Sequence, residues 1–168
     1  PYTLRSGVSA LIANEARLSG GRGRIVLKLN SLVDAELIDE LYRASQAGVR
    51  IDLIVRGICC LRPGITGLSD NIRVRSIVGR YLEHSRIFYF ANGAGVGESR
   101  YYIGSADLMP RNLDRRVEAL VRVDDAVAQR RLQEVIDFVL RDDELAWTLD
   151  ANGGYTLLGG RTFQSHDA

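Results

Sequence analysis

A histidine and an arginine two positions apart are the most chemically suggestive residues of the sequence. His84 and Arg86 lie within residues 81–90, whose alternating residue types predict a strand. Arginine offers phosphate oxygens a rigid fork of donors, and an imidazole can give or accept a proton near neutral pH. The pair therefore suits a phosphate, although taken alone so short a motif is better explained by a half-buried strand with a satisfied histidine and a surface arginine. The expected common face of this strand consists of Leu82, His84, Arg86, Phe88 and Phe90.

Arg56 is a second candidate because of its place in the chain. It directly follows an apolar segment, residues 49–55, that reads as a strand. In open α/β sheets, ligands collect beyond the carboxyl ends of such strands. Gly57 and the turn at residues 62–64 make Arg56 the start of a loop that could fold over a ligand. The alternative is a loop arginine that pairs with a nearby carboxylate.

The composition is that of one soluble globular domain. The chain has 168 residues, of which 46% are hydrophobic and 26% charged, with a net charge of +1. This balance gives no support to broad nucleic-acid binding. Of the 22 basic residues only Lys28 is a lysine. Arginine is favoured where phosphates are gripped bidentately, but a bias toward arginine codons would give the same preference.

Cysteine usage and apolar run lengths restrict the class of protein. Cys59 and Cys60 are adjacent and have no cysteine partners elsewhere. This arrangement argues against a disulfide framework and a thiolate zinc site, and favours a reducing compartment. No apolar run reaches the length that crosses a bilayer. Because the first residue is Pro1 rather than Met, we expect a fragment of something longer.

Apolar periodicity predicts an α/β domain in which these candidates are placed by strands. Residues 3–18 have helical spacing and residues 24–29 read as a strand. Ser31 could cap the next helix, with Asp34 completing a capping box and Gly48 ending the helix. Strand, helix and strand over some thirty residues predict a βαβ unit with parallel strands.

The second half of the chain predicts shorter strands and one long helix. We expect strands at residues 72–78, 101–105 and 117–123, with a hairpin-like turn at 92–97 before the second of them. A helix capped by Asp124 or Asp125 should follow, with an apolar stripe formed by Leu132, Val135, Ile136, Val139 and Leu140. The chain should end with a hairpin across 152–154 and a frayed polar segment past Arg161.

Three segments in this order carry a family resemblance: RGICCLRPG at residues 56–64, EHSR at 83–86 and GSADLMPRN at 104–112. Together they closely resemble the C-terminal catalytic domain of the polyphosphate kinases, the phospholipase-D-like class that makes polyphosphate from ATP. The likeness runs from about residue 2 to about residue 155. It implies an α/β, phospholipase-D-like domain with a mixed β-sheet flanked by α-helices. We divide the chain into this domain, residues 1–160, and a polar tail, residues 161–168.

The sequence departs from the broader phospholipase D pattern of His-x-Lys, a following Asp, and Gly-Ser-x-Asn. Arg86 stands where that pattern has lysine, and Asp107 stands where it has asparagine. Ala91 and Asn92 occupy the place of the following aspartate. These departures weaken a phosphodiesterase assignment and fit the kinase branch.

The resemblance implies roles for four residues of this chain. His84 matches the family's second essential histidine, a catalytic residue facing the nucleotide phosphates, and Arg56 matches an arginine that binds ATP phosphate. Arg111 and Arg115 fall where the family lines its phosphate channel with basic side chains. The histidine that becomes phosphorylated belongs to the preceding domain. Magnesium accompanies ATP, its protein ligands are also expected in that missing part, and no metal site is expected here.

The remaining candidates are expected to support these four. Arg86, Asp107 and Glu118 could hold the arginines or His84 in place, or Asp107 and Glu118 could be ordinary carboxylates at strand ends. His166 lies in the polar tail and is expected to be incidental. The spatial expectation is that His84, Arg56, Arg111 and Arg115 gather at one rim and hold a chain of phosphates.

The resemblance implies a transferase: a polyphosphate kinase that reversibly transfers the ATP γ-phosphate to a growing chain through a phosphohistidine. The expected partners are ATP or ADP, inorganic polyphosphate, the remaining domains of the same polypeptide and further copies in a homo-oligomer, with no nucleic acid. The expected location is cytoplasmic, with peripheral membrane association as an option. This fragment alone is expected to be inactive. The alternatives are a phosphodiesterase or nuclease that pairs two His84 sites by dimerising, and a non-catalytic polyanion-binding module.

Overall fold

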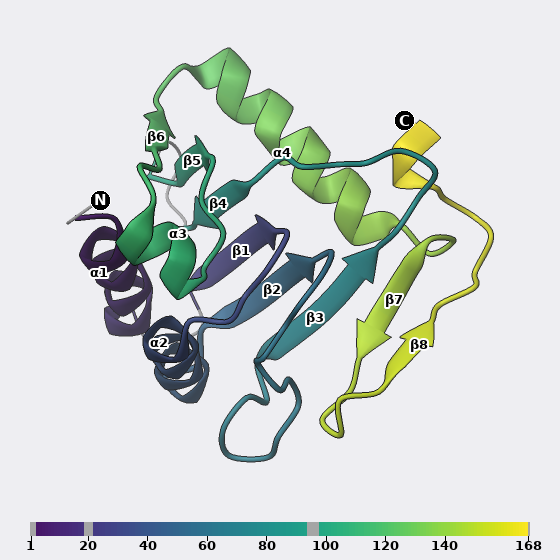
Figure 1. Cartoon of the computed structure of the whole chain (residues 1–168), viewed down its shortest axis with the longest axis horizontal. Helices are drawn as coiled ribbons and strands as arrows, with labels where there is room; N and C mark the ends of the chain where they lie inside the picture. The colour runs from purple at the N-terminus through teal and green to yellow at the C-terminus, as the bar shows by residue number, and fades with distance from the viewer. Residues whose placement is uncertain (1–2, 19–21, 94–97, 168) are drawn as a thin grey trace.

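One mixed sheet organises the molecule. The computed structural model describes residues 3–18, 22–93 and 98–167, and in them eight strands pair in the order β6-β5-β4-β1-β2-β3-β7-β8 (Figure 1). The strands are β1 (Arg24–Leu29), β2 (Arg50–Val55), β3 (Ile72–Ile77), β4 (Ile87–Phe90), β5 (Arg100–Gly104), β6 (Leu120–Val123), β7 (Ala146–Leu149) and β8 (Tyr155–Leu157). The helices are α1 (Leu4–Arg17), α2 (Ala35–Gln46), α3 (Pro110–Arg115), α4 (Ala126–Arg141) and the 3₁₀ turn η1 (Ser165–Asp167).

The centre of the sheet is parallel, as the βαβ pattern predicts. β1 pairs with β2 from Arg24↔Arg50 to Leu29↔Val55, and β2 pairs in parallel with β3. β4, β5 and β6 extend the sheet beyond β1 in antiparallel fashion, and β7 and β8 extend it beyond β3. The expected mixed α/β architecture is therefore confirmed.

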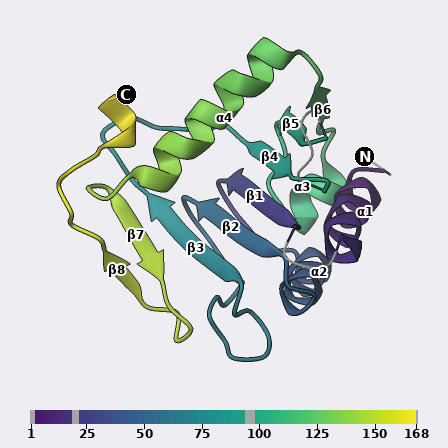
Figure 2. The same cartoon turned by 180° about the vertical axis from the view of Figure 1, so that it is seen from behind.

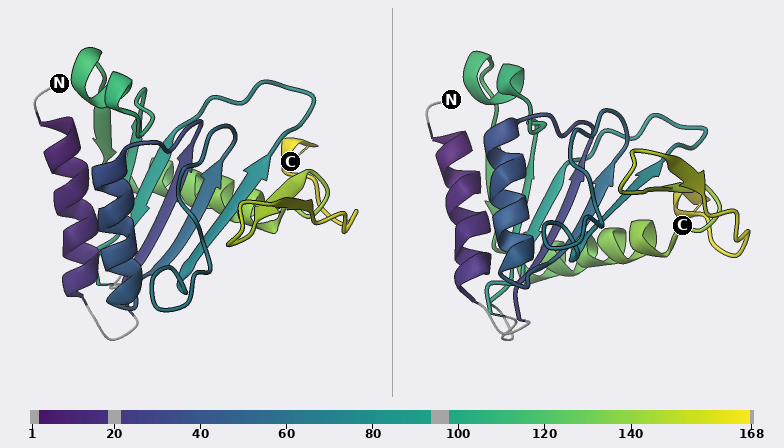
Figure 3. Two further views of the ribbon diagram at one scale, coloured as in Figure 1. Left: turned by 60° about the horizontal axis from the view of Figure 1, so that its bottom comes forward. Right: turned by 90° about the horizontal axis from the view of Figure 1, so that it is seen from below.

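Helices cover both faces of the sheet (Figure 3). α1 and α2 lie side by side on one face and close the larger core, which contains Ile12, Leu41 and Phe88. α4 crosses the other face over a smaller core, to which it contributes the buried Ile136 and Val139 of its predicted stripe. The cap of α4 is Asp125, whose side chain accepts from the backbone N–H of Ala128 at 2.8 Å. None of the described helices is long and apolar enough to cross a membrane.

The start of α2 differs from the prediction. Asp34 rather than Ser31 is the N-cap, and its side chain accepts from the backbone N–H of Leu37 at 3.1 Å. The helix cannot begin earlier because the preceding residues are extended and bonded elsewhere. Leu32 forms parallel bridges with Cys59 and Leu108. This arrangement joins the loops after β1 and β2 to the segment before α3.

The predicted strand at residues 81–90 is wrong in its first half, because only Ile87–Phe90 is a strand. β4 pairs with β1 no further than Lys28↔Ile87, and beyond Leu29 the chain of β1 turns toward other loops. Without a neighbouring strand, the alternating segment has no partner for its backbone groups and forms a loop. The common face also fails: Phe88 and Phe90 are buried, whereas Leu82 and His84 are exposed.

The remaining boundaries shift for local reasons. β4 and β5 form the expected antiparallel pair, with Phe90 opposite Arg100, while residues 94–97 of the predicted turn lie outside the described residues. The strand predicted at 117–123 begins only at Leu120, because the Glu118 side chain is bonded to Asn112 near the start of α3. The hairpin across 152–154 is confirmed by the pairing of β7 with β8.

The end of the chain is packed rather than frayed, contrary to the prediction. The Phe163 ring lies against Phe138 of α4, with ring centroids 5.9 Å apart. The backbone N–H and the hydroxyl of Ser165 both donate to Asp142, at 2.8 and 2.7 Å. These contacts hold η1 beside the end of α4 (Figure 2). Because Asp142 is buried, the segment that it binds is ordered, although the polar composition of that segment does not indicate this.

Candidate functional site

The candidate residues belong to segments that meet at one edge of the sheet. The loops that leave β1 and β2, the loop between β3 and β4, and the segment containing α3 all lie at the edge toward which the parallel strands point (Figure 3). This is the edge where ligands collect in open α/β sheets. The elements that carry the candidates therefore meet at one edge, and the gathering of the four side chains around a ligand stays a prediction.

Arg56 is fixed at this edge by its backbone. Its N–H donates to the carbonyl of Leu29 at 3.2 Å, and its carbonyl accepts from the Ser76 hydroxyl at 3.0 Å. The neighbouring strands thus hold the residue directly after β2 ends. Its side chain is half-buried and lines a cavity of about 380 Å³.

This cavity combines an apolar floor with a polar rim. Ile54 and Ile77 from the sheet, with Val139 from α4, contribute to the floor. The rim carries polar side chains from β1, from the loop before β4 and from the C-terminal segment: Lys28, Arg56, Tyr81, Glu83, Ser85 and His166. His166, expected to be incidental, is thus a neighbour of Arg56 across the cavity, and no local sequence signal could have shown this.

His84 lies in the loop before β4 with its side chain exposed. Its two neighbours, Glu83 and Ser85, line the same cavity as Arg56. Its carbonyl accepts from the Arg86 guanidinium at 3.1 Å, so its backbone is held while the imidazole remains accessible. The geometry suits a histidine that contacts a ligand rather than one that fills a core.

Arg86 and Asp107, two of the three departures from the phospholipase D pattern, form an ion pair with each other. The guanidinium donates to both carboxylate oxygens, at 3.1 and 3.0 Å. Asp107 also accepts from the backbone N–H groups of Asn30 and Ser31, at 2.7 and 3.2 Å. The pair therefore ties the His84 loop to the loop after β1, and Arg86 supports the site rather than offering its fork to a ligand.

Glu118 holds the segment that contains α3. It accepts from the Asn112 side-chain amide at 2.7 Å and from the Ser105 hydroxyl. The Ser105 hydroxyl in turn accepts from the backbone N–H of Ala119 at 3.2 Å. Glu118 thus has a structural role within its own segment, and its bonded partners do not include the candidate arginines.

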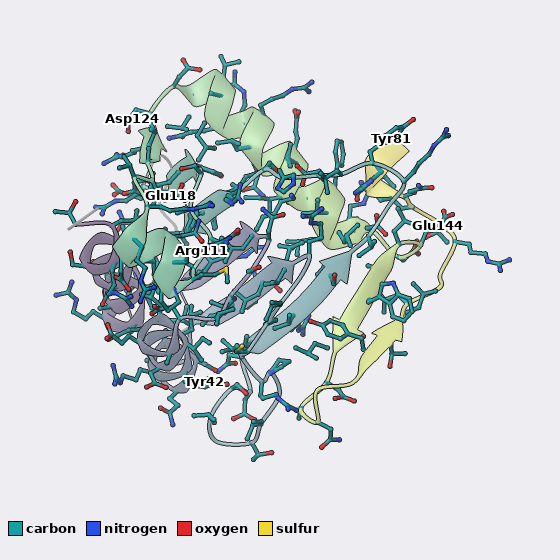
Figure 4. The ribbon with its side chains drawn as sticks, in the orientation of Figure 1. Tyr42, Tyr81, Arg111, Glu118, Asp124 and Glu144 are labelled. Carbon is teal, nitrogen blue, oxygen red and sulfur yellow. The ribbon has the colours of Figure 1, made fainter. Side chains whose placement is uncertain are left out.

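Arg111 and Arg115 are exposed on α3. Figure 4 shows Arg111 and Glu118 near each other on the α3 side of the edge. The helix is anchored from α1, because the Arg5 guanidinium donates to Asp114 at 3.0 and 2.8 Å and also to Asp34 at 2.5 and 2.6 Å. These carboxylates raise the pKa of Arg5, led by the hydrogen bond to Asp34. These contacts fix the position of α3, and its exposed Arg111 and Arg115 remain accessible to a ligand.

Lys28 is a site residue that sequence reasoning missed. It is the last pairing position of β1 with β4, and it is almost fully buried although it is charged. Burial, followed by the nearby charges of Arg56 and Arg86, lowers the pKa of Lys28 to about 8. Its ion pair with Glu83 works in the opposite direction. The available signal was its status as the single lysine in an arginine-rich chain.

The side chains of this edge do not fit a metal ion. Asp107, Glu118 and Glu83 are each bonded to protein donors, as described above. Burial raises the pKa of the Cys59 thiol to about 11, which disfavours the thiolate that metals require. Among the described residues, no three His, Cys, Asp or Glu side chains form a group that could hold a metal.

Comparison with known proteins places this geometry in a family. The model of the family described as "Polyphosphate kinase C-terminal domain 2" matches residues 1–168. The chain is 57% identical over 157 residues to a polyphosphate kinase of Synechocystis and 53% identical over 161 residues to polyphosphate kinase 1 of Chlorobaculum tepidum. These matches cover 92% and 94% of this chain but 21% and 22% of the relatives, so it spans about a fifth of their length.

Solved structures of related proteins have the same fold as this chain. The crystal structure of polyphosphate kinase from Porphyromonas gingivalis superimposes with a TM-score of 0.90 at 39% identity, over 99% of this chain and 26% of that one. A phospholipase D family member, Nuc from Salmonella typhimurium, shares the fold with a TM-score of 0.55 at 16% identity, over 79% of this chain and 84% of that one. The predicted fold class is confirmed. With a match along its whole length, this chain belongs to the polyphosphate kinase C-terminal domain 2 family.

Proposed function

We propose that this chain supplies the nucleotide- and polyphosphate-binding side of the active site of an ATP:polyphosphate phosphotransferase. The observation that carries the proposal is the set of cationic groups at the carboxyl edge of the sheet. Arg56 lines the cavity there, His84 is exposed between two cavity-lining residues, and α3 presents Arg111 and Arg115 to solvent. A chain of phosphates is the kind of ligand that such an edge attracts.

The chemistry of phosphoryl transfer matches these side chains. The reaction depends on positioning and on neutralising charge around the transferred group, and one well-placed arginine is worth roughly a thousandfold or more in rate. In the proposal Arg56 binds ATP phosphate, while Arg111 and Arg115 guide the polyphosphate chain. His84 hydrogen-bonds the reacting phosphate or protonates a leaving oxygen.

The proposed reaction is the reversible transfer of the ATP γ-phosphate to polyphosphate through a phosphohistidine outside this chain. Because this chain spans about a fifth of its relatives, that histidine is assigned to the rest of the polypeptide. Magnesium would arrive with ATP and take its protein ligands there as well, since the carboxylates of this edge are engaged. The partner domains, the homo-oligomer and a cytoplasmic location belong to the same proposal and follow from the family alone.

A binding experiment tests the phosphate site on this chain. We expect long-chain polyphosphate to bind, and Arg56→Ala and Arg111→Ala each to weaken binding about tenfold, because each change removes a charged hydrogen-bonding group. Arg43→Ala is the matched control, since Arg43 is an exposed arginine of α2 that pairs with Glu40. Equal affinity of wild type and both site variants would contradict the proposal.

A reconstitution experiment tests the reaction. The chain is mixed with the separately expressed preceding domains, and ATP-dependent growth of polyphosphate is measured. We expect His84→Ala to reduce the rate by about 10²–10⁴-fold. Binding without restored growth would indicate a non-catalytic polyanion module. Metal-free hydrolysis of a chromogenic phosphodiester, abolished by the same substitution, would indicate a phosphodiesterase.

A further inference from the structure

We propose that Lys28 is a positioning residue that holds the His84 loop in its phosphate-facing conformation. The inference rests on the proposed function, because it assigns Lys28 an effect that is transmitted through His84. Lys28 comes from β1, whereas His84 belongs to the loop before β4, so the contact joins the sheet to the candidate catalytic side chain.

The ammonium group is fully engaged by this loop. It donates to the Ser85 hydroxyl at 3.0 Å and to the Ser85 carbonyl at 3.3 Å, and it forms an ion pair with Glu83. A lysine ammonium has three donors, and these are three acceptors. The acceptors lie on the residues immediately before and after His84. The contact therefore holds the Ser85 backbone directly and the Glu83 side chain on the other side of the imidazole.

A second contact, from Arg86, holds the backbone of His84 itself. Arg86 donates to the His84 carbonyl and is itself locked by Asp107. With Lys28 holding the neighbours and Arg86 holding the carbonyl, the main positional freedom left to His84 is rotation of its side chain. Such restraint is what a group that must meet a reacting phosphate requires, because small misplacements cost large factors in rate.

The choice of lysine supports a specific role. Every other basic residue of the chain is an arginine, yet this nearly buried position keeps a lysine. A planar guanidinium cannot direct three donors from one atom toward three acceptors, whereas a compact ammonium can. The charge is also unfavourable here, since burial and the cations Arg56 and Arg86 disfavour it. The contact is therefore not explained by a gain in stability, which is consistent with a positioning role.

The charged environment predicts how the contact responds to pH. Arg56, directly after β2, and Arg86, directly before β4, oppose the ammonium, and Glu83 favours it from the loop. Tyr81 and His166 face the same cavity from the loop and from the C-terminal segment. As the pH rises past about 8, Lys28 loses its proton and the ion pair with Glu83 is lost.

The decisive experiment combines substitution with two measurements on the 168-residue chain. Lys28→Met removes the ammonium, and Glu83→Gln removes the negative charge that pairs with it, at a partly exposed position outside the core. The matched control is Glu134→Gln, which breaks an exposed ion pair with Arg131 on α4. The measurements are the affinity for long-chain polyphosphate and the NMR signals of the residue 83–86 amides and the histidine rings.

We expect Lys28→Met not to lower the melting temperature, because the buried charge that it removes is unfavourable. The substitution should shift the loop signals and weaken polyphosphate binding about tenfold, which corresponds to the loss of one charged hydrogen bond. Glu83→Gln should shift the same signals less, and the control should shift none. In wild type these signals should titrate with a midpoint near pH 8, and the titration should vanish in Lys28→Met. In a His84→Ala background, Lys28→Met should have no further effect on affinity, because its effect is transmitted through the imidazole.

Three results would overturn the inference. Unmoved loop signals in Lys28→Met would show that the contact does not hold the loop. Moved signals with unchanged affinity would show that the loop position does not matter for binding. A full tenfold effect in the His84→Ala background would show that Lys28 attracts phosphate directly. Failure of the proposed function is separate, because it would appear as unchanged binding in His84→Ala and Arg56→Ala themselves.

Discussion

The ion pair between Arg86 and Asp107 allows a quantitative test of how the site is held together. Their side chains are only 17% and 10% exposed. Removing one partner leaves a charge that solvent screens poorly, and such changes cost about 3–5 kcal/mol. The backbone N–H groups of Asn30 and Ser31 still stabilise a lone carboxylate, so we take the lower end of that range.

The perturbation is a double-mutant cycle with Arg86→Met and Asp107→Asn. Each single change should lower the free energy of unfolding by about 3 kcal/mol, because each leaves one partly buried charge. The double variant leaves no unpaired charge, and asparagine can still accept from the backbone, so its loss should not exceed that of either single change, about 3 kcal/mol, and should lie well below the sum of about 6. Urea unfolding at pH 7, followed by circular dichroism and by Trp147 fluorescence, measures all four proteins.

The exposed pair of Arg43 and Glu40 is the matched control for this cycle. Its members lie one helical turn apart on α2, and the arginine side chain is 65% exposed. Pairs of this kind contribute about 0.3–0.5 kcal/mol. If the Arg86 and Asp107 losses simply add, as they nearly should for the control, the two residues do not act as a unit and the structural explanation of both departures is refuted.

Three other contacts around the site predict measurable effects. Because the fold lowers the pKa of Lys28 to about 8 from its ordinary 10.5, the unfolded state binds more protons between these values. In urea titrations, the unfolding free energy of wild type minus that of Lys28→Met should therefore increase by up to ~3 kcal/mol between pH 8 and 10.5. A difference that does not change with pH would contradict this. Arg5→Ala should lower the unfolding free energy by about 1–2 kcal/mol and weaken polyphosphate binding, because α3 loses its anchor, whereas the exposed Arg17→Ala on the same helix should do neither. In Gly79→Ala the new methyl group would overlap the His166 ring. Amide exchange in the C-terminal segment should then accelerate, and unchanged exchange would show that the segment does not depend on this contact.

Elements stabilised mainly by their own sequence pattern could be predicted. The apolar runs of β1 and β2 are typical of strands buried on both faces, and the stripe of α2 containing Leu37 and Leu41 has the helical period of one buried face. Because α2 lies between β1 and β2, the connection is a crossover, and the two strands are therefore parallel. The same reasoning found α4 with its Asp125 cap. The parallel direction of β1 and β2 and the position of Arg56 at their carboxyl edge follow from these elements.

Features that depend on a distant partner could not be predicted. Residues 81–86 alternate like a strand, but a strand also needs a neighbour, and β1 offers none beyond Lys28. The C-terminal segment reads as polar, yet Asp142 holds Ser165 from 23 positions away. The sequence marks Arg86 and Asp107 as departures from a pattern without showing that they meet.

The cations of this edge divide into two groups, and the division explains how a chain of net charge +1 can offer a phosphate site. The structural cations are neutralised by carboxylates: Arg5 by Asp34 and Asp114, Lys28 by Glu83, and Arg86 by Asp107. We propose that the local positive field comes from the other group, Arg56, Arg111 and Arg115. Pairing each structural cation with a carboxylate fixes the loops and α3 and reduces the repulsion that these cations add to that field. We therefore infer that phosphate affinity depends on where these few arginines are held and not on the number of basic residues, so that new surface arginines far from this edge would not replace them.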